Sequence, residues 1–480
     1  MIIARSNLVP EPARLTQKLS IKDELILSPR TEILSDSAKE RRHTDSHSYQ
    51  LTHKMISRVM ERSLAIFSLL VFIFHISSGA QKVRYDGHKL IRIVPTSNHS
   101  LTFLQQLNSA SASLGLDFWS YPTTLRQPVD IHIPPNYLQE LSNVLQYQNI
   151  TYRVLVNDLQ RLLQKEYSPS GSKPTSEDFD AKYHSYSEIL DELRRLVYTT
   201  NHAKLVRIGT SYEFNRIYGI EIFENESNAR PLIFINCGLH AREWLSPATC
   251  MFLVRQLLSN TSHNASSLRS DYTWIIVPVL NVDGYQYSFS TERFWRKNRS
   301  FGRGGCIGVD LNRNFNHQFG GAGTSADPCN MLYHGRHAFS EPETYALGRY
   351  LLSRRNELKV FLDIHSFGQL IMSPWGHTRR YSPHYKSIQE PLMKRMSDAI
   401  AAVHGRKFTY GSACIVIYPT TGDATDWTYA NLGVVHSYSI ELRPTVFQDE
   451  RGFIVPPEQI VDSGSEILNG MIELVRNLDD

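Results

Sequence analysis

The chain has 480 residues, which is enough for about two to four domains of ~100–200 residues each. Hydrophobic residues make up 41% and charged residues 20%, a composition that is ordinary for a globular protein and argues against disorder along the whole chain. The formal net charge is only +4, and no basic stripe interleaved with aromatic residues occurs, so the sequence predicts no nucleic-acid partner.

Targeting signals come first in the chain. Residues 63–76 form a short apolar run that follows several basic residues and precedes small ones, the pattern of a secretory signal peptide, which we place at 55–80. Because a signal peptide normally begins a chain, we interpret residues 1–54 as an unstructured upstream extension, with translation starting at Met55 or Met60. A type II membrane anchor is the alternative, and the shortness of the run disfavours it. We therefore predict a secreted, extracellular protein without stable membrane association.

Secretion places the cysteines in an oxidising compartment, where pairing is expected. The chain has five cysteines, so one is left over. Asn-x-Ser/Thr sequons fit a secreted glycoprotein. The sequons are at Asn98, Asn149, Asn225, Asn260 and Asn264, and a sixth, at Asn298, is discounted because it lies within the W-R-K-N-R segment discussed below.

Residues 81–165 alternate short apolar strands with helical stretches. Strands are predicted at 90–94 and 129–133, and helices at 137–145 and 155–163. These elements are enough for a small α/β open sandwich.

A segment rich in Ser, Pro and Gly follows, and we place an exposed linker at 166–179. Lys165 and Lys173 offer a trypsin-like protease a cleavage site there.

Residues 180–480 predict one large α/β domain. Long apolar strands alternate with helices, which favours a largely parallel or mixed central sheet flanked by helices. The predicted strands are 231–236, 272–280, 359–364 and 434–440, and the predicted helices include 247–258 and 387–403.

Two of these strands end at potential metal ligands. His240 and Glu243 form an H-x-x-E pair directly after the strand at 231–236, a spacing that lets an imidazole and a carboxylate reach one ion. His365 follows the strand at 359–364, and the ends of strands are where α/β sheets place their sites. Three protein ligands with one position open to water are typical of catalytic zinc. An isolated H-x-x-E pair is common by chance, so the motifs that accompany it carry the weight.

Those motifs follow in a set order. They are W-R-K-N-R at 295–299, G-V-D-L-N-R-N at 308–314, Tyr418 and E-L-R at 441–443. Together with the H-x-x-E pair, the pattern resembles the zinc metallocarboxypeptidases of the pancreatic A/B type, and the resemblance extends from residue 81 onward.

The resemblance implies a mixed central sheet with one Zn²⁺ per chain, bound by His240, Glu243 and His365. It implies an inactive precursor in which residues 81–165 are the propeptide and 180–480 the catalytic domain. The enzyme would be a monomer that a trypsin-like protease activates and that removes single residues from the C-termini of peptides and proteins.

The resemblance also implies roles for individual residues. Glu441 would be the general base, and Arg299 would stabilise the negative oxygen of the tetrahedral intermediate. Arg313, with Asn312 beside it, would bind the terminal carboxylate, and Tyr418 would close over the terminal residue. Further substrate-binding residues implied by the resemblance are Arg242, Arg296 and Phe453, and the implied disulfides are Cys306–Cys329 and Cys237–Cys250, with Cys414 unpaired.

The specificity pocket departs from the family's pattern. Thr425 stands where B-type enzymes carry Asp and A-type enzymes an apolar residue, and Asp423 lies two positions earlier. A neutral pocket favours aliphatic or aromatic C-terminal residues, with a B-like preference for Lys or Arg as the alternative.

Two further hypotheses stay open. One is a family member that binds peptide termini without cutting them, and the other is a zinc amidohydrolase that acts on small acylated amino acids. Glu441 has its own alternative, a structural ion pair with Arg443.

Overall fold

The computed structural model describes residues 82–167, 179–226, 230–259, 265–445 and 451–478. All of them belong to one compact unit, Ala80–Asp480. The extension predicted at 1–54, the signal peptide predicted at 55–80 and most of the linker predicted at 166–179 lie outside the described residues and remain predictions. Within the described segments, no helix has both the length and the apolar character required to cross a membrane.

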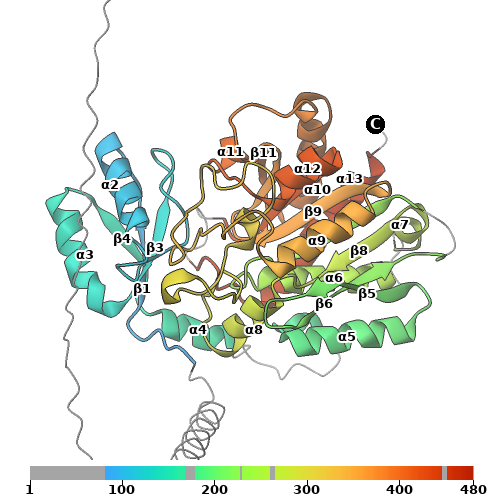
Figure 1. The fold of residues 1–480 in the computed structure, drawn as a ribbon, viewed down its shortest axis with the longest axis horizontal. Helices are drawn as coiled ribbons and strands as arrows, with labels where there is room; N and C mark the ends of the chain where they lie inside the picture. The colour runs from blue at the N-terminus through green and yellow to red at the C-terminus, as the bar shows by residue number, and fades with distance from the viewer. Residues whose placement is uncertain (1–81, 168–178, 227–229, 260–264, 446–450, 479–480) are drawn as a thin grey trace, which may run out of the picture. The chain divides into compact units, whose positions relative to one another are not determined.

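The first part of the described chain is a small antiparallel sheet covered by helices. Its four strands are hydrogen-bonded in the order β2-β3-β1-β4. The helices pack on the sheet through Leu104, Leu141 and Leu145, which share an apolar core with Ile91 and Ile131 (Figure 1). The elements are β1 (Lys89–Ile93), α2 (Asn98–Ser109), β2 (Asp117–Phe118), β3 (Val129–Ile133), α3 (Pro135–Tyr147), β4 (Tyr152–Val156) and α4 (Leu159–Tyr167).

One predicted helix in this region is wrong at its start. Residues 155 and 156 belong to strand β4, and the helix α4 begins only at Leu159. The segment Tyr152–Val156 pairs with β1 along its length, and this pairing outweighs the helical spacing of its apolar residues. Helix α4 also runs two residues into the predicted linker, to Tyr167.

The rest of the chain is built on an eight-stranded mixed sheet, which confirms the predicted fold class. The strand order is β11-β10-β12-β9-β7-β8-β6-β5. The central strands β12, β9, β7 and β8 are parallel neighbours, and antiparallel pairs flank them at β10/β12 and β6/β8. The strands are β5 (Ala203–Thr210), β6 (Arg216–Ile222), β7 (Leu232–Cys237), β8 (Thr273–Val277), β9 (Leu358–Ser366), β10 (Leu370–Ser373), β11 (Thr409–Ser412) and β12 (His436–Leu442).

Helices flank this sheet (Figure 1). Helix α13 packs against α6 and α10, while α9 lies against β5 and α12 against β9 and β12. The α-helices are α5 (Tyr186–Thr199), α6 (Leu245–Leu258), α7 (Ala265–Asp271), α8 (Val282–Ser290), α9 (Pro342–Ser353), α10 (Glu390–His404), α11 (Ala413–Val416), α12 (Ala424–Leu432) and α13 (Ile460–Arg476).

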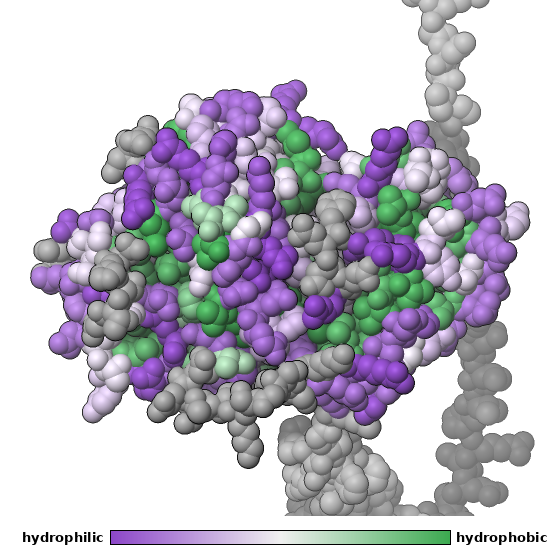
Figure 2. Space-filling model, turned by 180° about the vertical axis from the view of Figure 1, so that it is seen from behind, coloured by the Kyte–Doolittle hydropathy of each residue, from purple (hydrophilic) through white to green (hydrophobic). Residues whose placement is uncertain are grey.

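The apolar side chains are mainly inside this layered structure. Strands β7 and β8 are buried along their whole length, as expected for parallel strands covered on both faces. Figure 2 shows hydrophilic side chains over most of the face it presents, with smaller hydrophobic areas between them. The buried central strands therefore form a rigid support for the residues at their carboxyl ends.

Candidate active site

Three predicted metal ligands meet at the carboxyl end of the central sheet. His240 Nδ1 lies 2.7 Å from Glu243 Oε1, and His365 Nδ1 lies 2.9 Å from Glu243 Oε2. The two Nδ1 atoms are 3.1 Å apart. All three residues are buried, and their ligand atoms are close enough together to hold one metal ion. The structure therefore brings together the three residues that the sequence singled out on two different strands.

Buried carboxylates hold both imidazoles from the other side. His240 Nε2 lies 3.1 Å from Asp310 Oδ1, and His365 Nε2 lies 2.9 Å from Asp363 Oδ2. With each Nε2–H donated to a carboxylate, the Nδ1 lone pair is available to a metal ion, an arrangement that is usual for zinc-binding histidines. Two imidazoles, one carboxylate and this second layer of carboxylates fit a Zn²⁺ ion.

Asp310 and Asp363 were missed from the sequence. Asp363 lies in a largely apolar strand, and Asp310 lies inside the G-V-D-L-N-R-N motif. An ionisable residue in a segment expected to be buried was the signal that could have revealed them. Burial raises the pKa of Asp310, but the charges of Arg296 and His240 outweigh burial and hold this pKa well below its usual range. Asp310 is therefore ionised in its contact with His240.

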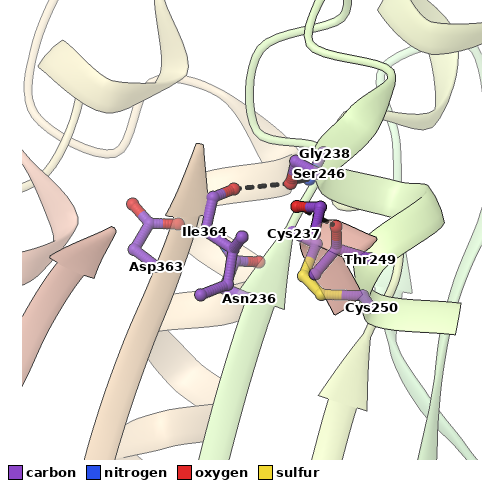
Figure 3. The surroundings of a disulfide bond; sticks show 9 residues. Asn236, Cys237, Gly238, Ser246, Thr249, Cys250, Asp363 and Ile364 are labelled. Carbon is purple, nitrogen blue, oxygen red and sulfur yellow. Dashed lines mark hydrogen bonds between the residues drawn. A yellow bond between two sulfur atoms is a disulfide. The ribbon is translucent and has the colours of Figure 1, made fainter. Parts of the chain in front are cut away.

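Local packing connects the strands that carry the ligands (Figure 3). Gly238, which follows β7, has a left-handed φ of 61°, and a Cβ there would lie 3.0 Å from the backbone of residue 279. Its N–H donates to Ser246 Oγ, and that hydroxyl donates to the carbonyl of Ile364 in β9, at 2.5 Å. The disulfide Cys237–Cys250 joins the end of β7 to helix α6. The turn that carries His240 is thus anchored to the strand that carries His365.

Glu441 lies on β12 opposite His365 on β9 in the parallel register. It lines the same cavity as the three ligands. Burial raises the pKa of Glu441 to about 8, while the charge of His365 opposes this rise and the carboxylate of Glu243 adds to it. The alternative role for Glu441, a structural ion pair with Arg443, is wrong, because Arg443 forms its ion pairs with Glu466 and Asp462.

The cavity beside the ligands has a volume of about 80 Å³ and contains most of the predicted substrate-binding residues. Arg313 is held in one orientation because its Nε donates to the carbonyl of Gly323 at 2.9 Å and its Nη1 donates to that of Asn312 at 2.7 Å. Burial raises the pKa of Tyr418 to about 12, so its hydroxyl keeps its proton. The predicted residues that line this cavity are Asn312, Arg313, Tyr418, Asp423, Thr425 and Arg296.

The structure separates the two arginines of the W-R-K-N-R motif. Arg296 is buried, donates to Asp310 Oδ2 at 2.8 Å and comes within 3.9 Å of Glu243. Arg299 instead stacks on Tyr287, with its Cζ 3.5 Å from the ring centroid, and on Trp295. It does not line the cavity that contains the metal ligands. The structure therefore places Arg296, and not Arg299, beside the metal ligands.

The N-terminal sandwich covers the entrance to the site. Arg242 Nη1 lies 2.9 Å from both carboxylate oxygens of Asp117, and its guanidinium packs 4.2 Å from the centroid of the Phe453 ring. Tyr121 packs edge-on against Tyr418, with centroids 5.5 Å apart. A cavity of about 210 Å³ lies between the sandwich and the sheet, and Arg242, Phe453 and Glu441 are among the residues that line it.

Comparison with known proteins identifies this architecture. A family model described as zinc carboxypeptidase matches residues 189–470, and a model described as carboxypeptidase activation peptide matches residues 91–166. The chain belongs to the zinc carboxypeptidase family. This carboxypeptidase is 32% identical over 423 residues to zinc carboxypeptidase A 1 of Anopheles gambiae, covering 87% of this chain and 95% of that protein. It is also 32% identical over 420 residues to carboxypeptidase A1 of Bos taurus, covering 85% and 98%.

Solved structures agree with this identification. The carboxypeptidase superposes on thrombin activatable fibrinolysis inhibitor with a TM-score of 0.75 at 27% identity, covering 82% of this chain and 99% of that one. It superposes on carboxypeptidase A from Helicoverpa armigera with a TM-score of 0.73 at 29% identity, covering 83% and 98%. The N-terminal sandwich is thus an activation peptide, and the chain is a carboxypeptidase zymogen.

The cysteines pair as the resemblance implied. The disulfides are Cys237–Cys250 and Cys306–Cys329. Cys414 is unpaired and buried, as a small apolar side chain would be. The Cys237–Cys250 loop contains His240 and Glu243, and the Cys306–Cys329 loop lies between them and His365 along the chain.

Proposed function

We propose that this protein is a secreted carboxypeptidase that hydrolyses the last peptide bond of a substrate with a free C-terminus. The observation that carries the proposal is that a fixed guanidinium, Arg313, lines the same small cavity as Glu441 and the three zinc ligands. A guanidinium binds a carboxylate through a planar pair of hydrogen bonds. The reaction would therefore take place a fixed distance from the terminal carboxylate, which is what restricts an enzyme to single terminal residues.

His240, Glu243 and His365 would hold one Zn²⁺ ion. Bound there, zinc supplies a Lewis acid that polarises the scissile carbonyl and makes a water molecule more acidic. The ionised form of Glu441 would be favoured by a Zn²⁺ ion bound beside it, and the carboxylate would then take a proton from the attacking water and deliver it to the nitrogen of the leaving amino acid. Its place on a buried strand, beside His365, restricts it to one position in the cavity.

Arg296 is our candidate for stabilising the negative oxygen that develops on the substrate. Its guanidinium is held by Asp310 and lies near Glu243, so it is preorganised and needs no rearrangement during the reaction. Tyr418 lines both cavities, and its protonated hydroxyl is available as a donor to the substrate. Asn312 would assist Arg313 at the terminal carboxylate.

For the terminal side chain we propose an A-like preference, for aliphatic or aromatic residues. Thr425 faces the cavity without a charge. Asp423 is engaged elsewhere, because it caps helix α12 by accepting from Asp426 N–H at 2.8 Å and accepts from Thr420 Oγ1 at 3.3 Å. The other lining residues include Met372, Ala413 and Ser439. A B-like preference would need a free carboxylate among the residues that line this cavity, to bind the charge of a terminal Lys or Arg.

Secretion is part of the proposal. The apolar run at 63–76, two disulfides and five sequons all fit an extracellular protein. We also propose a monomer that a trypsin-like protease activates in the segment after α4.

Glu441→Gln tests the assignment of the base. The variant should bind as much zinc as the wild type, because the three ligands are intact, and should lose most of its turnover on a C-terminally varied dipeptide panel. Asp191→Gln, at an exposed position in α5, is the control and should turn over normally. Retained turnover in Glu441→Gln would assign the base to another group. Hydrolysis of acylated amino acids in place of dipeptides would favour an amidohydrolase, and binding without hydrolysis would favour a non-catalytic family member.

A further inference from the structure

A second group of potential metal ligands lies apart from the catalytic three. His317, His377 and Asp426 each offer one ligand atom, and these atoms lie within 4.8 Å of one another. His377 Nδ1 is 2.9 Å from Asp426 Oδ2, and the rings of His317 and His377 meet edge to face with centroids 5.0 Å apart. Within the described ranges, only this group and the catalytic one assemble three such ligands.

Three separate segments contribute to this group. His317 lies in the loop after the Leu311–Arg313 turn, His377 follows strand β10, and Asp426 lies in the first turn of α12. Hydrogen bonds from backbone N–H groups connect the three segments, since Gly422 N–H donates to the carbonyl of His317 at 2.9 Å and Gly376 N–H donates to the side-chain Oδ1 of Asp426 at 2.8 Å. The convergence is a product of the fold, and no sequence spacing signals it.

One nitrogen of this group has no partner. His317 Nε2 is buried, and no described residue forms a hydrogen bond with it. Trp375 stacks on the His317 ring, with centroids 5.3 Å apart and planes 11° from parallel, so the ring plane is fixed. Buried polar atoms in proteins are almost always satisfied by a partner, a water molecule or an ion. The hydrogen bond between His377 and Asp426 leaves this nitrogen unsatisfied.

We propose that His317, His377 and Asp426 bind a second divalent transition-metal ion, with Zn²⁺ as the first candidate. Two imidazoles and a carboxylate suit zinc, whereas Ca²⁺ and Mg²⁺ prefer oxygen ligands. Ligand atoms of one zinc ion lie at most about 4 Å apart. Binding an ion would draw the three ligand atoms, which lie within 4.8 Å of one another, together to that limit, and the partial exposure of the two imidazoles leaves room for a water molecule as the fourth ligand.

The position of this site gives the ion a structural effect. Asp426 and its neighbour Thr425 line the cavity beside Arg313, and Gly376 is hydrogen-bonded to Asp426. An ion held here would cross-link three segments that form the outer wall of that cavity. The proposal does not depend on the function proposed above, because it concerns different ligands.

Zinc content tests the proposal on the full chain. The wild type, equilibrated with zinc and then freed of unbound metal, should contain two zinc ions per chain by elemental mass spectrometry. His317→Phe and His377→Phe should contain one fewer, while each keeps an aromatic ring beside Trp375. His337→Phe, an exposed histidine outside the group, is the matched control and should equal the wild type. His365→Ala removes the catalytic-site ion alone and should still contain one.

Thermal unfolding supplies a second readout on the same proteins. Zinc should raise the Tm of His365→Ala, and it should not raise the Tm of the double variant His365→Ala/His377→Phe. Equal zinc content in the wild type and in a folded His377→Phe protein overturns the proposal, whatever the catalytic site contains. An equal zinc-dependent rise of Tm in the single and double variants overturns it as well.

Discussion

A buried ion pair between the activation peptide and the catalytic part gives the most direct route to testing how the zymogen is held inactive. Glu166, in α4, accepts from Arg293 Nε at 2.9 Å and from its Nη2 at 2.7 Å. The side chains are 1% and 0% exposed, and the guanidinium also packs 3.7 Å from the centroid of the Trp244 ring. Glu166→Gln preserves the volume and removes the carboxylate that Arg293 binds.

Removing one partner of a buried ion pair costs about 3–5 kcal/mol. This free-energy cost destabilises the state in which the activation peptide is docked on the catalytic part, because Arg293 becomes hydrated when the peptide moves away. At about 1.4 kcal/mol per factor of ten, the undocked fraction should rise about a hundredfold or more.

The assay is the residual peptidase activity of the intact, uncleaved chain. Glu166→Gln should raise it strongly, while Glu140→Gln, at an exposed position of α3, should leave it unchanged. After cleavage at Lys173, which removes residue 166 with the activation peptide, all of these enzymes have the same sequence and should have the same activity. Unchanged residual activity in an intact, folded Glu166→Gln chain would refute the reasoning.

Two further predictions concern the catalytic part. Arg296→Ala should lower kcat by about a hundredfold to a thousandfold at saturating zinc. The kcat of Arg299→Ala should stay close to that of the wild type. A larger loss in Arg299→Ala than in Arg296→Ala would return the oxyanion role to Arg299. Burial raises the pKa of Glu343 from 4.5 to about 7, so the folded state binds its proton more tightly than the unfolded state. The free energy of unfolding should therefore fall as pH rises through this range, by up to about 3 kcal/mol. Urea denaturation should show this fall in the wild type and a flatter profile in Glu343→Gln.

The central strands could be predicted because they are buried on both faces. β7, β8 and β9 are mainly apolar, β12 mixes apolar and polar residues, and the predicted ranges match all four to within a few residues. The flanking strands β5, β6, β10 and β11 were not predicted. Strand β10 has only four residues, and β11 reads Thr-Tyr-Gly-Ser, so neither segment shows a strong strand pattern. They form strands because they pair with neighbouring strands, and a single sequence does not reveal that pairing.

The site shows a similar division. The motifs and the family resemblance that they carry were enough to select the three metal ligands and the cavity residues Arg313, Tyr418 and Thr425. The sequence could not show which of Arg296 and Arg299 lies near the metal ligands, because the two arginines are only three residues apart in one short motif. In the structure Arg296 is buried against Asp310 near the metal ligands, whereas Arg299 stacks on Tyr287.

The account depends most on recognition of a free C-terminus beside the zinc ligands. The direct measurement is mass spectrometry of two peptides of identical sequence, one with a free C-terminal carboxylate and one amidated, each incubated with the trimmed enzyme and zinc. Stepwise loss of single residues from the free peptide, with the amidated peptide intact, is the predicted result. Equal cleavage of both peptides, internal cleavage, or no release from the free peptide would contradict the role given to Arg313 and the function built on it.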